Sequence, residues 1–293
     1  MVRFQRWFTP WVLVAPALAW LLVFSVWPSI NTVRLSFTDA KPLGGNVDWV
    51  GARNYTDLIH DSQVWSALLN SVVYTVVCLP LLTVLPLMLA VLVERKLPGI
   101  AFFRTAYYVP VIASAVVVGL MWTWLLDDRG LINNVARALH ILEHPLPFLT
   151  DRWLVVFSAI SLTVWKGLGY YMIVYLAALA NVRRELHEAA AMDGAGAWQR
   201  FRFVTWPNLR YLTVVATTLD IINTIRHYDI IGVMTGGGPA GGTEVLPVLL
   251  YNLAFRSNRF GEASATGVLL LVLVLAFAVV YVKLAKLDRA DGG

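Results

Sequence analysis

The sequence predicts an all-α, polytopic membrane protein with six transmembrane helices, and three observations support this fold class. Hydrophobic residues make up 58% of the 293 residues and charged residues make up 14%, whereas about 25% of the residues in soluble domains are charged. The 12 Trp, 11 Tyr and 13 Phe residues suit a protein with aromatic belts at both membrane interfaces. Six apolar runs are each long enough for a transmembrane helix, which needs roughly 20 residues.

The six apolar runs predict the spans in order. We expect them at about residues 11–30, 64–93, 101–126, 154–180, 211–234 and 263–284. Strands of a membrane β-barrel would be about 10 residues long with alternating polarity, and these runs are longer and uniformly apolar. Pro80 and Pro86 interrupt the second run, and Gly167 and Gly169 interrupt the fourth. Membrane helices tolerate such residues when neighbouring helices satisfy the backbone.

The distribution of Lys and Arg predicts the orientation of the spans. With the N-terminus inside, the inner segments hold 13 Lys and Arg residues and the outer segments hold 8, while 6 acidic residues lie inside and 10 outside. The positive-inside rule therefore places both termini and the loop at about 181–208 in the cytoplasm. The outer loops, at about 31–63 and 127–153, are too short for independent domains, so we expect one transmembrane domain over residues 1–293.

Three other features narrow the class of protein. Arg3 and Arg6 precede an apolar run, as in a signal peptide, but this run continues to about residue 30, which is long for a signal core. The net charge of +5 is not gathered on one basic face, which argues against nucleic acid as a partner. The single cysteine, Cys78, cannot form an internal disulfide, and we expect it to be a small buried residue.

A polar, alanine-rich stretch separates the fourth and fifth apolar runs. Residues 183–193, RRELHEAAAMD, contain good helix formers. Gly194 and Gly196 interrupt the pattern, and residues 197–206, AWQRFRFVTW, can form a second short helix that Pro207 ends. The stretch therefore predicts a pair of short helices.

The side chains of this helix pair suit a contact with another protein. Ala189 and Ala190 leave little bulk, so another backbone could approach closely, and Glu188 offers an unpaired carboxylate that an arginine of a partner could bind. Apolar contact surface would come from Leu186, Met192, Trp198 and Phe201. On this chemistry alone, a helix pair that lies on lipid headgroups is an equal alternative.

The same stretch resembles the EAA loop of bacterial ABC importer permeases. The family pattern is Glu-Ala-Ala, then Asp-Gly-Ala, then an aromatic residue and a closing proline. This chain carries Glu188, Ala189 and Ala190, then Asp193, Gly194 and Ala195, then Phe201 and Pro207, with Trp206 where leucine is common. The resemblance implies an ABC importer permease (MetI-like) fold over nearly the whole chain and a location in the bacterial inner membrane.

The resemblance also implies partners and a mechanism. The loop would be a coupling helix that docks into a groove of a homodimeric cytosolic ATPase, with Glu188 against a basic residue and Gly194 at the turn. The ATPase would bind ATP and Mg, so this chain would carry no cofactor and no catalytic site. A second homologous permease would complete the pathway in the lipid, and an extracytoplasmic binding protein would deliver the substrate for transport by alternating access.

A glycine-rich loop refines the resemblance. The residues VMTGGGPAGGTEVL, from Val233 to Leu246, resemble the maltose-type and glycerol-phosphate-type permeases. This resemblance implies import of a sugar, or alternatively of glycerol phosphate or another polyol derivative. Glycines alone would indicate only a flexible outer loop. A phosphate-binding loop would need a lysine after its last glycine, and this loop has none.

Polar residues inside the fourth and fifth spans are the candidates for binding substrate, because charges at membrane depth are costly and usually functional. The family lines its cavity from these two spans, and Asp220, Asn223 and His227 share one helix face. The expected binding residues are Lys166, Gly167, Tyr170, Asn223 and His227. Trp165 and Tyr171, with Tyr170, offer rings for stacking on a sugar.

A structural role for these charges is the alternative. Lys166 with Asp220, or Arg226 with Asp229, could form an ion pair that holds the helices together. A lone histidine without a second ligand does not predict a metal site. An intramembrane enzyme would need a catalytic pair or metal motif within the spans, and a secondary transporter would show inverted repeats. The sequence offers neither, so both classes fit less well than the permease.

Overall fold

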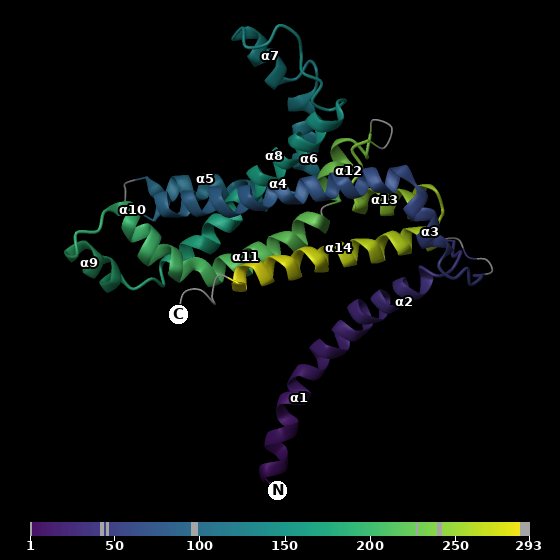
Figure 1. The fold of residues 1–293 in the computed structure, drawn as a ribbon, viewed down its shortest axis with the longest axis horizontal. Coiled ribbons are helices and arrows are strands. Elements are labelled where there is room, and N and C mark those ends of the chain that lie inside the picture. The colour runs from purple at the N-terminus through teal and green to yellow at the C-terminus, as the bar shows by residue number, and fades with distance from the viewer. Residues whose placement is uncertain are drawn as a thin grey trace. The chain divides into compact units, whose positions relative to one another are not determined.

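The computed structural model describes residues 2–41, 44, 47–94, 99–226, 228–238 and 242–287, with the backbone alone for residues 2–10, 229, 286 and 287. Over these ranges the chain is helical (Figure 1). The one extended pairing in the described residues is an isolated antiparallel bridge between Thr38 and Trp49. The predicted all-α class is therefore confirmed.

Four helical segments of the described chain are long and apolar enough to cross a membrane, and they coincide with the first, second, fourth and sixth predicted spans. They are Trp11–Leu35, Ser62–Val93, Arg152–Leu179 and Phe260–Ala285. The first covers the C-terminal part of α1 (Val2–Leu21), a π-helical turn (Leu22–Val26) and α2 (Trp27–Leu35). The others belong to α4 (Ser62–Val93), α8 (Arg152–Leu179) and α14 (Phe260–Leu287).

The third predicted span is not one continuous helix. It consists of α5 (Ile100–Ile112) and α6 (Ala115–Leu126), and the chain bends by 100° between them. Pro110 lies in the last turn of α5 and removes one backbone donor there. Both helices are apolar, which is why the apolar run alone predicted a single helix.

The fifth predicted span also differs from a continuous helix. α11 (Trp206–Arg226) is followed by a separate short helix, α12 (Asp229–Met234). α11 carries Asp220, Asn223 and several threonines, so it is less apolar than the other long helices. Among the described helices it is not one of those that are apolar enough to count as a span by composition alone.

The described chain divides into two compact units. The smaller comprises Met1–Val64 and Leu249–Leu271, and it holds α3 (Arg53–His60). The side chain of Asn54 is buried and donates hydrogen bonds to the carbonyls of Ser36 and Thr38, both at 2.8 Å. A Cβ at Gly261 would lie 2.0 Å from the Thr38 carbonyl oxygen, so this close approach of two backbones requires glycine.

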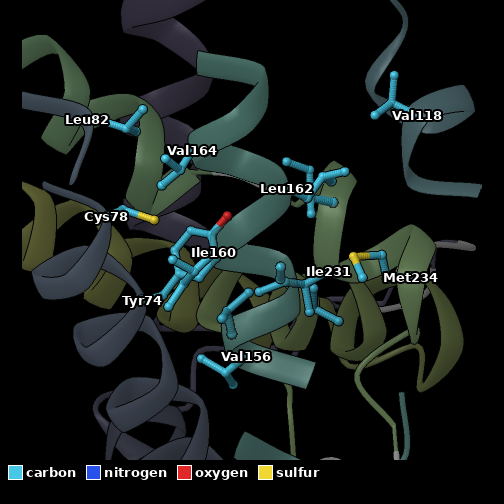
Figure 2. Close-up of a cluster of buried hydrophobic side chains, with 14 of the residues drawn as sticks. Tyr74, Cys78, Leu82, Val118, Val156, Ile160, Leu162, Val164, Ile231 and Met234 are labelled. Atoms are coloured by element: carbon cyan, nitrogen blue, oxygen red, sulfur yellow. The ribbon is translucent and has the colours of Figure 1, made fainter. Parts of the chain in front are cut away.

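The larger unit comprises Trp65–Val248 and Val272–Gly293, and α8 contacts α5, α11 and α12 within it. Asp151 caps the N-terminus of α8 by accepting from the amides of Trp153 and Leu154, both at 3.0 Å. Buried side chains of α4, α6, α8 and α12 form the main core, and Figure 2 shows ten of them with labels. Cys78 is fully buried in this core, as the sequence predicts.

A second buried cluster lies further along α8. It joins the C-terminal parts of α4 and α8 to the start of α11 through Leu87, Ala90, Val93, Met172, Tyr175, Leu179 and Leu209. Phe201 and Trp206 pack against this cluster, so the end of the polar loop is attached directly to the core of the larger unit.

Candidate functional site

The polar loop between α8 and α11 contains the two predicted short helices. These are α9 (Arg184–Met192) and α10 (Ala197–Arg200). Gly194 lies between them with a φ of +80°, a left-handed conformation that favours glycine. The amide of Ala195 donates to the carbonyl of Ala190 at 2.9 Å, which closes the end of α9. Gly194 thus forms the expected turn.

Pro207 does not end the second helix, in contrast to the sequence prediction. α10 continues through a π-helical turn, Phe201–Thr205, directly into α11. The amide of Trp206 bonds to the carbonyl of Phe201, five residues back. Pro207 therefore lies inside a continuous helix, directly after the π-helical turn, where the α-helical hydrogen-bonding pattern is already interrupted. The loop and the following helix therefore form one uninterrupted element.

The outer surface of α9 and α10 is strongly exposed. Met192 is 89% exposed and Trp198 is 72% exposed, and the ring of Trp198 stacks on that of Phe201 with centroids 5.6 Å apart. Asp193 and Ala189 are also exposed, and Ala190 is half-buried. Exposed large apolar side chains beside small residues suit the docking role.

Glu188 is not unpaired, which corrects the sequence expectation. Its Oε1 lies 3.3 Å from Nε of Arg184, one turn earlier on α9. The two side chains are 67% and 91% exposed, and ion pairs of this kind contribute about 0–1 kcal/mol. The carboxylate can therefore exchange this arginine for a partner's basic residue at little cost.

A cavity of about 320 Å³ lies between α8 and α11. It brings together Lys166, Gly167 and Tyr170 of α8 with Asn223 of α11, four of the five residues predicted to bind substrate. The fifth, His227, lies outside the described residues. The other lining residues are Leu82, Val111, Ala115, Thr163, Tyr171, Asp220, Thr224 and Ile230.

Several polar groups of this cavity have spare hydrogen-bonding capacity. Lys166 Nζ donates to the carbonyl of Val111 at 3.3 Å and has two further N–H groups. Asn223 meets the hydroxyl of Tyr171 through its side-chain amide, which still has further donor and acceptor positions, and the hydroxyl of Tyr170 has no hydrogen-bond partner among the described residues. Both Asn223 and Tyr170 are exposed. The cavity can therefore offer donors and acceptors to a polar ligand.

Asp220 is buried beside the cavity and does not pair with Lys166. Its Oδ1 accepts from the hydroxyl of Tyr171 at 2.9 Å and from that of Thr224 at 3.2 Å. Its Oδ2 is buried without a hydrogen-bond partner among the described residues. The alternative of a structural Lys166–Asp220 ion pair is therefore not realised. The other alternative, Arg226 with Asp229, involves a side chain outside the described residues.

Only one of the three predicted aromatic residues presents an accessible ring to the cavity. Tyr170 is 47% exposed and meets Tyr171 edge to face, with centroids 5.1 Å apart. Tyr171 is buried, and its hydroxyl is used by Asp220. Trp165 packs against Trp122 and does not line the cavity.

Gly167 and Gly169 permit close packing of α8. A Cβ at Gly169 would lie 2.1 Å from the backbone oxygen of Tyr107 on α5. A Cβ at Gly167 would lie 2.8 Å from a terminal methyl of Leu82, a flexible side chain that also lines the cavity. Gly169, which the sequence did not single out for the site, thus sets the position of α5 against α8.

Polar side chains of α4 hold the described part of the glycine-rich loop. Asn70 Nδ2 donates to the carbonyls of Gly242 and Glu244 at 2.9 and 2.8 Å, and the amide of Leu246 donates to Ser71 Oγ at 2.9 Å. Arg152 donates to Asn70 Oδ1 at 3.2 Å. This part of the loop is therefore fixed to the ends of α4 and α8.

Comparison with known proteins gives a consistent result. A family model described as "Binding-protein-dependent transport system inner membrane component" matches residues 59–287. The lactose transport system permease protein LacF of Rhizobium radiobacter is 34% identical over 278 residues, covering 92% of each chain. The trehalose/maltose transport system permease protein MalF of Thermococcus litoralis is 29% identical over 280 residues, covering 95% of this chain and 94% of the relative.

A solved structure has the same fold. It is a bacterial alginate ABC transporter in complex with an alginate pentasaccharide-bound periplasmic protein. The matched chain has a TM-score of 0.81 and 24% sequence identity, and the match covers 94% of both chains.

Proposed function

This chain belongs to the family of binding-protein-dependent transport system inner membrane components, and from that premise we propose that it imports a sugar through the cavity between α8 and α11. As a family member it is a multi-pass inner membrane protein and the non-catalytic permease subunit of an ABC importer. What we propose is that the substrate is a sugar, which residues bind it, and which other proteins complete the complex.

The observation that carries the proposal is the chemistry of the cavity. A sugar presents many hydroxyl groups, each of which donates and accepts hydrogen bonds, and an apolar ring face that stacks on aromatic side chains. Lys166 and Asn223 each use part of their hydrogen-bonding capacity and can supply further donors and, from Asn223, acceptors, while Tyr170 supplies an accessible ring. Lactose and trehalose/maltose appear in the names of the similar permeases, which supports the same substrate class.

We infer the coupling path from the continuity of the loop with α11. A homodimeric cytosolic ATPase would bind Glu188 and the exposed surface of α9 and α10. Because α10 runs without interruption into α11, movement of the docked loop would reach Asn223 along one helix. The residues proposed for coupling are Glu188, Ala189, Ala190, Asp193, Gly194, Phe201 and Pro207.

The proposed complex follows the family. It contains a second homologous permease and an extracytoplasmic binding protein, and ATP-driven closure of the ATPase exposes the cavity outward. We propose six spans, with the bent α5–α6 pair and α11–α12 as the third and fifth, and both termini in the cytoplasm. The charge distribution along the sequence supports this orientation.

ATP-driven uptake tests the proposal. The permease, its partner permease, the ATPase and the binding protein are reconstituted in liposomes, and uptake of labelled lactose, maltose and glycerol 3-phosphate is measured. We expect uptake of a sugar that stops without the ATPase, and that falls at least about tenfold in Tyr170→Ala and Asn223→Ala although the complex assembles. Uptake of glycerol 3-phosphate alone would favour the polyol alternative, and uptake without the ATPase would favour a secondary transporter.

A further inference from the structure

The two charged residues that line the cavity, Lys166 and Asp220, do not neutralise each other. No ion pair joins them in the described residues, although both contribute to the same cavity wall. Each has instead a separate environment. This separation decides the net electrostatic field that a substrate meets.

The charge of Lys166 is directed to the end of α5. Its Nζ donates to the carbonyl of Val111, in the last turn of α5, at 3.3 Å. The C-terminus of a helix carries a partial negative charge of about half a unit, which attracts a cation. The helix break after Ile112 creates this terminus beside the cavity. Lys166 is thereby partly neutralised by a group other than Asp220.

The carboxylate of Asp220 has no cationic partner among the described residues. Only 2% of the residue is exposed, and its two hydrogen bonds come from neutral hydroxyls, of Tyr171 and Thr224. Neutral donors do not compensate a negative charge on this carboxyl group, and its Oδ2 has no hydrogen-bond partner among the described residues. In a low-dielectric surrounding, such a charge acts at longer range than it would in water.

We propose that Asp220 excludes anionic substrates, so that the cavity takes neutral saccharides and rejects uronates and phosphorylated polyols. The inference rests on the proposed function, since it concerns the substrate of the same cavity. Asp220 does not need to contact the substrate. It sets the sign of the field, whereas Tyr170, Asn223 and Lys166 form the contacts.

Equilibrium dialysis with two matched sugars tests the proposal. The permease pair with its ATPase is assembled in nanodiscs without the binding protein, and labelled methyl α-D-glucopyranoside and D-glucuronate are bound at pH 7. The two probes share one ring and differ by a carboxylate. We expect the wild-type complex to bind the neutral glucoside at least about tenfold more tightly, because a unit charge within about 10 Å has this effect at protein dielectric.

Asp220→Asn is the informative variant. The amide oxygen of Asn can still accept from Tyr171 and Thr224, so the change removes the charge and keeps the contacts. We expect the preference for the glucoside to fall about tenfold. Asn223→Asp adds a carboxylate one turn further along α11 and should increase the preference. If Asp220→Asn fails to assemble, the wild-type ratio decides, because equal or tighter binding of glucuronate would overturn the proposal.

Two results would overturn the role of Asp220. One is equal or tighter binding of glucuronate to the wild-type complex, and the other is an unchanged ratio in assembled Asp220→Asn. In either case, if Tyr170→Ala abolishes the measured sugar binding, the cavity is still the binding site and the proposed function stands. Absence of binding for both sugars, together with absence of ATP-driven sugar uptake, would overturn both proposals.

Discussion

The hydroxyl of Tyr171 on α8 donates a hydrogen bond to Oδ1 of Asp220 on α11, at 2.9 Å. Both residues are buried, and the contact lies in the wall of the cavity. It joins the two helices that carry Lys166, Tyr170 and Asn223. This buried hydrogen bond therefore contributes, with the apolar packing between α8 and α11, to the relative position of the binding groups.

Tyr171→Phe should lower the stability of the assembled complex. The variant leaves the packing of the ring intact and removes a donor from a buried carboxylate, which costs about 1–3 kcal/mol. Thermal unfolding of the complex measures the effect. Tyr170→Phe is the matched control, because the Tyr170 hydroxyl has no hydrogen-bond partner among the described residues. Equal stabilities for the two variants would contradict the assigned role of the bond.

Lys166 and Asp220 should behave independently in a double-mutant comparison. Lys166→Ala should reduce uptake at least about tenfold while assembly is retained, and Asp220→Ala should reduce assembly, since Tyr171 and Thr224 lose their acceptor. Because no ion pair joins the two residues, the double variant should assemble no better than Asp220→Ala. Assembly and uptake are scored separately for all four proteins. Restoration of both properties in the double variant would instead indicate an ion pair and defeat the binding role of Lys166.

Gly169→Ala and Gly167→Ala should differ although the positions are two residues apart. A methyl group at Gly169 would overlap the backbone of Tyr107, which cannot move without displacing α5, so we expect little assembled complex. At Gly167 the methyl group would overlap a terminal methyl of Leu82, which can adopt another rotamer, and would touch the ring of Tyr171 at an ordinary contact distance of 3.7 Å. That variant should assemble with reduced uptake because its cavity is smaller. Size-exclusion chromatography measures the assembled fraction, and full assembly of Gly169→Ala would show that α5 is less constrained than described.

Glu188→Lys should abolish uptake and weaken ATPase association while membrane insertion is unchanged. The change reverses the charge at the proposed docking position. Glu185→Lys is the matched control, since Glu185 is exposed on the same helix but lies outside the loop motif. Copurification of the ATPase with the permease measures association. Normal uptake in Glu188→Lys, or an equal loss in both variants, would refute a specific docking contact.

The orientation of the chain predicts which engineered cysteines are accessible from outside. In a Cys78→Ala background, cysteine at Ser257 should react with a membrane-impermeant maleimide in intact cells, whereas cysteine at Gln199 should react only after lysis. Both positions are exposed, so burial does not limit either reaction. The reverse pattern would invert the topology and remove the docking argument.

The sequence predicted those parts of the fold that depend on composition and on local backbone preferences. Long apolar runs marked α4, α8 and α14, and the glycine between α9 and α10 marked the turn. It did not predict the break after Ile112 or the helix through Pro207. The chain is apolar on both sides of the break after Ile112, so hydropathy does not reveal it. The helix through Pro207 depends on a π-helical turn that shifts the bonding pattern by one residue.

The cavity could be predicted in part because charged and polar residues are rare in membrane spans. That rarity drew attention to Lys166 and Asn223, which the structure places in one cavity. The partners of each group were not predictable. Lys166 bonds to a carbonyl that is free only because α5 ends there, and Asp220 bonds to Tyr171, 49 positions earlier in the chain. Both contacts depend on tertiary packing between helices.

The π-helical turn at Phe201–Thr205 also determines the direction in which the side chains of α11 point relative to those of α10. An α-helix advances by about 100° per residue, so the extra residue held in this turn rotates everything that follows relative to α10. Asp220 and Asn223 face α8 only with that offset. Deletion of one residue within the turn would let α10 and α11 form a regular α-helix, with the loop still docked and the polar face of α11 turned about 100° away from Lys166. The number of residues in this turn therefore decides whether the polar residues of α11 face the cavity when the loop is docked.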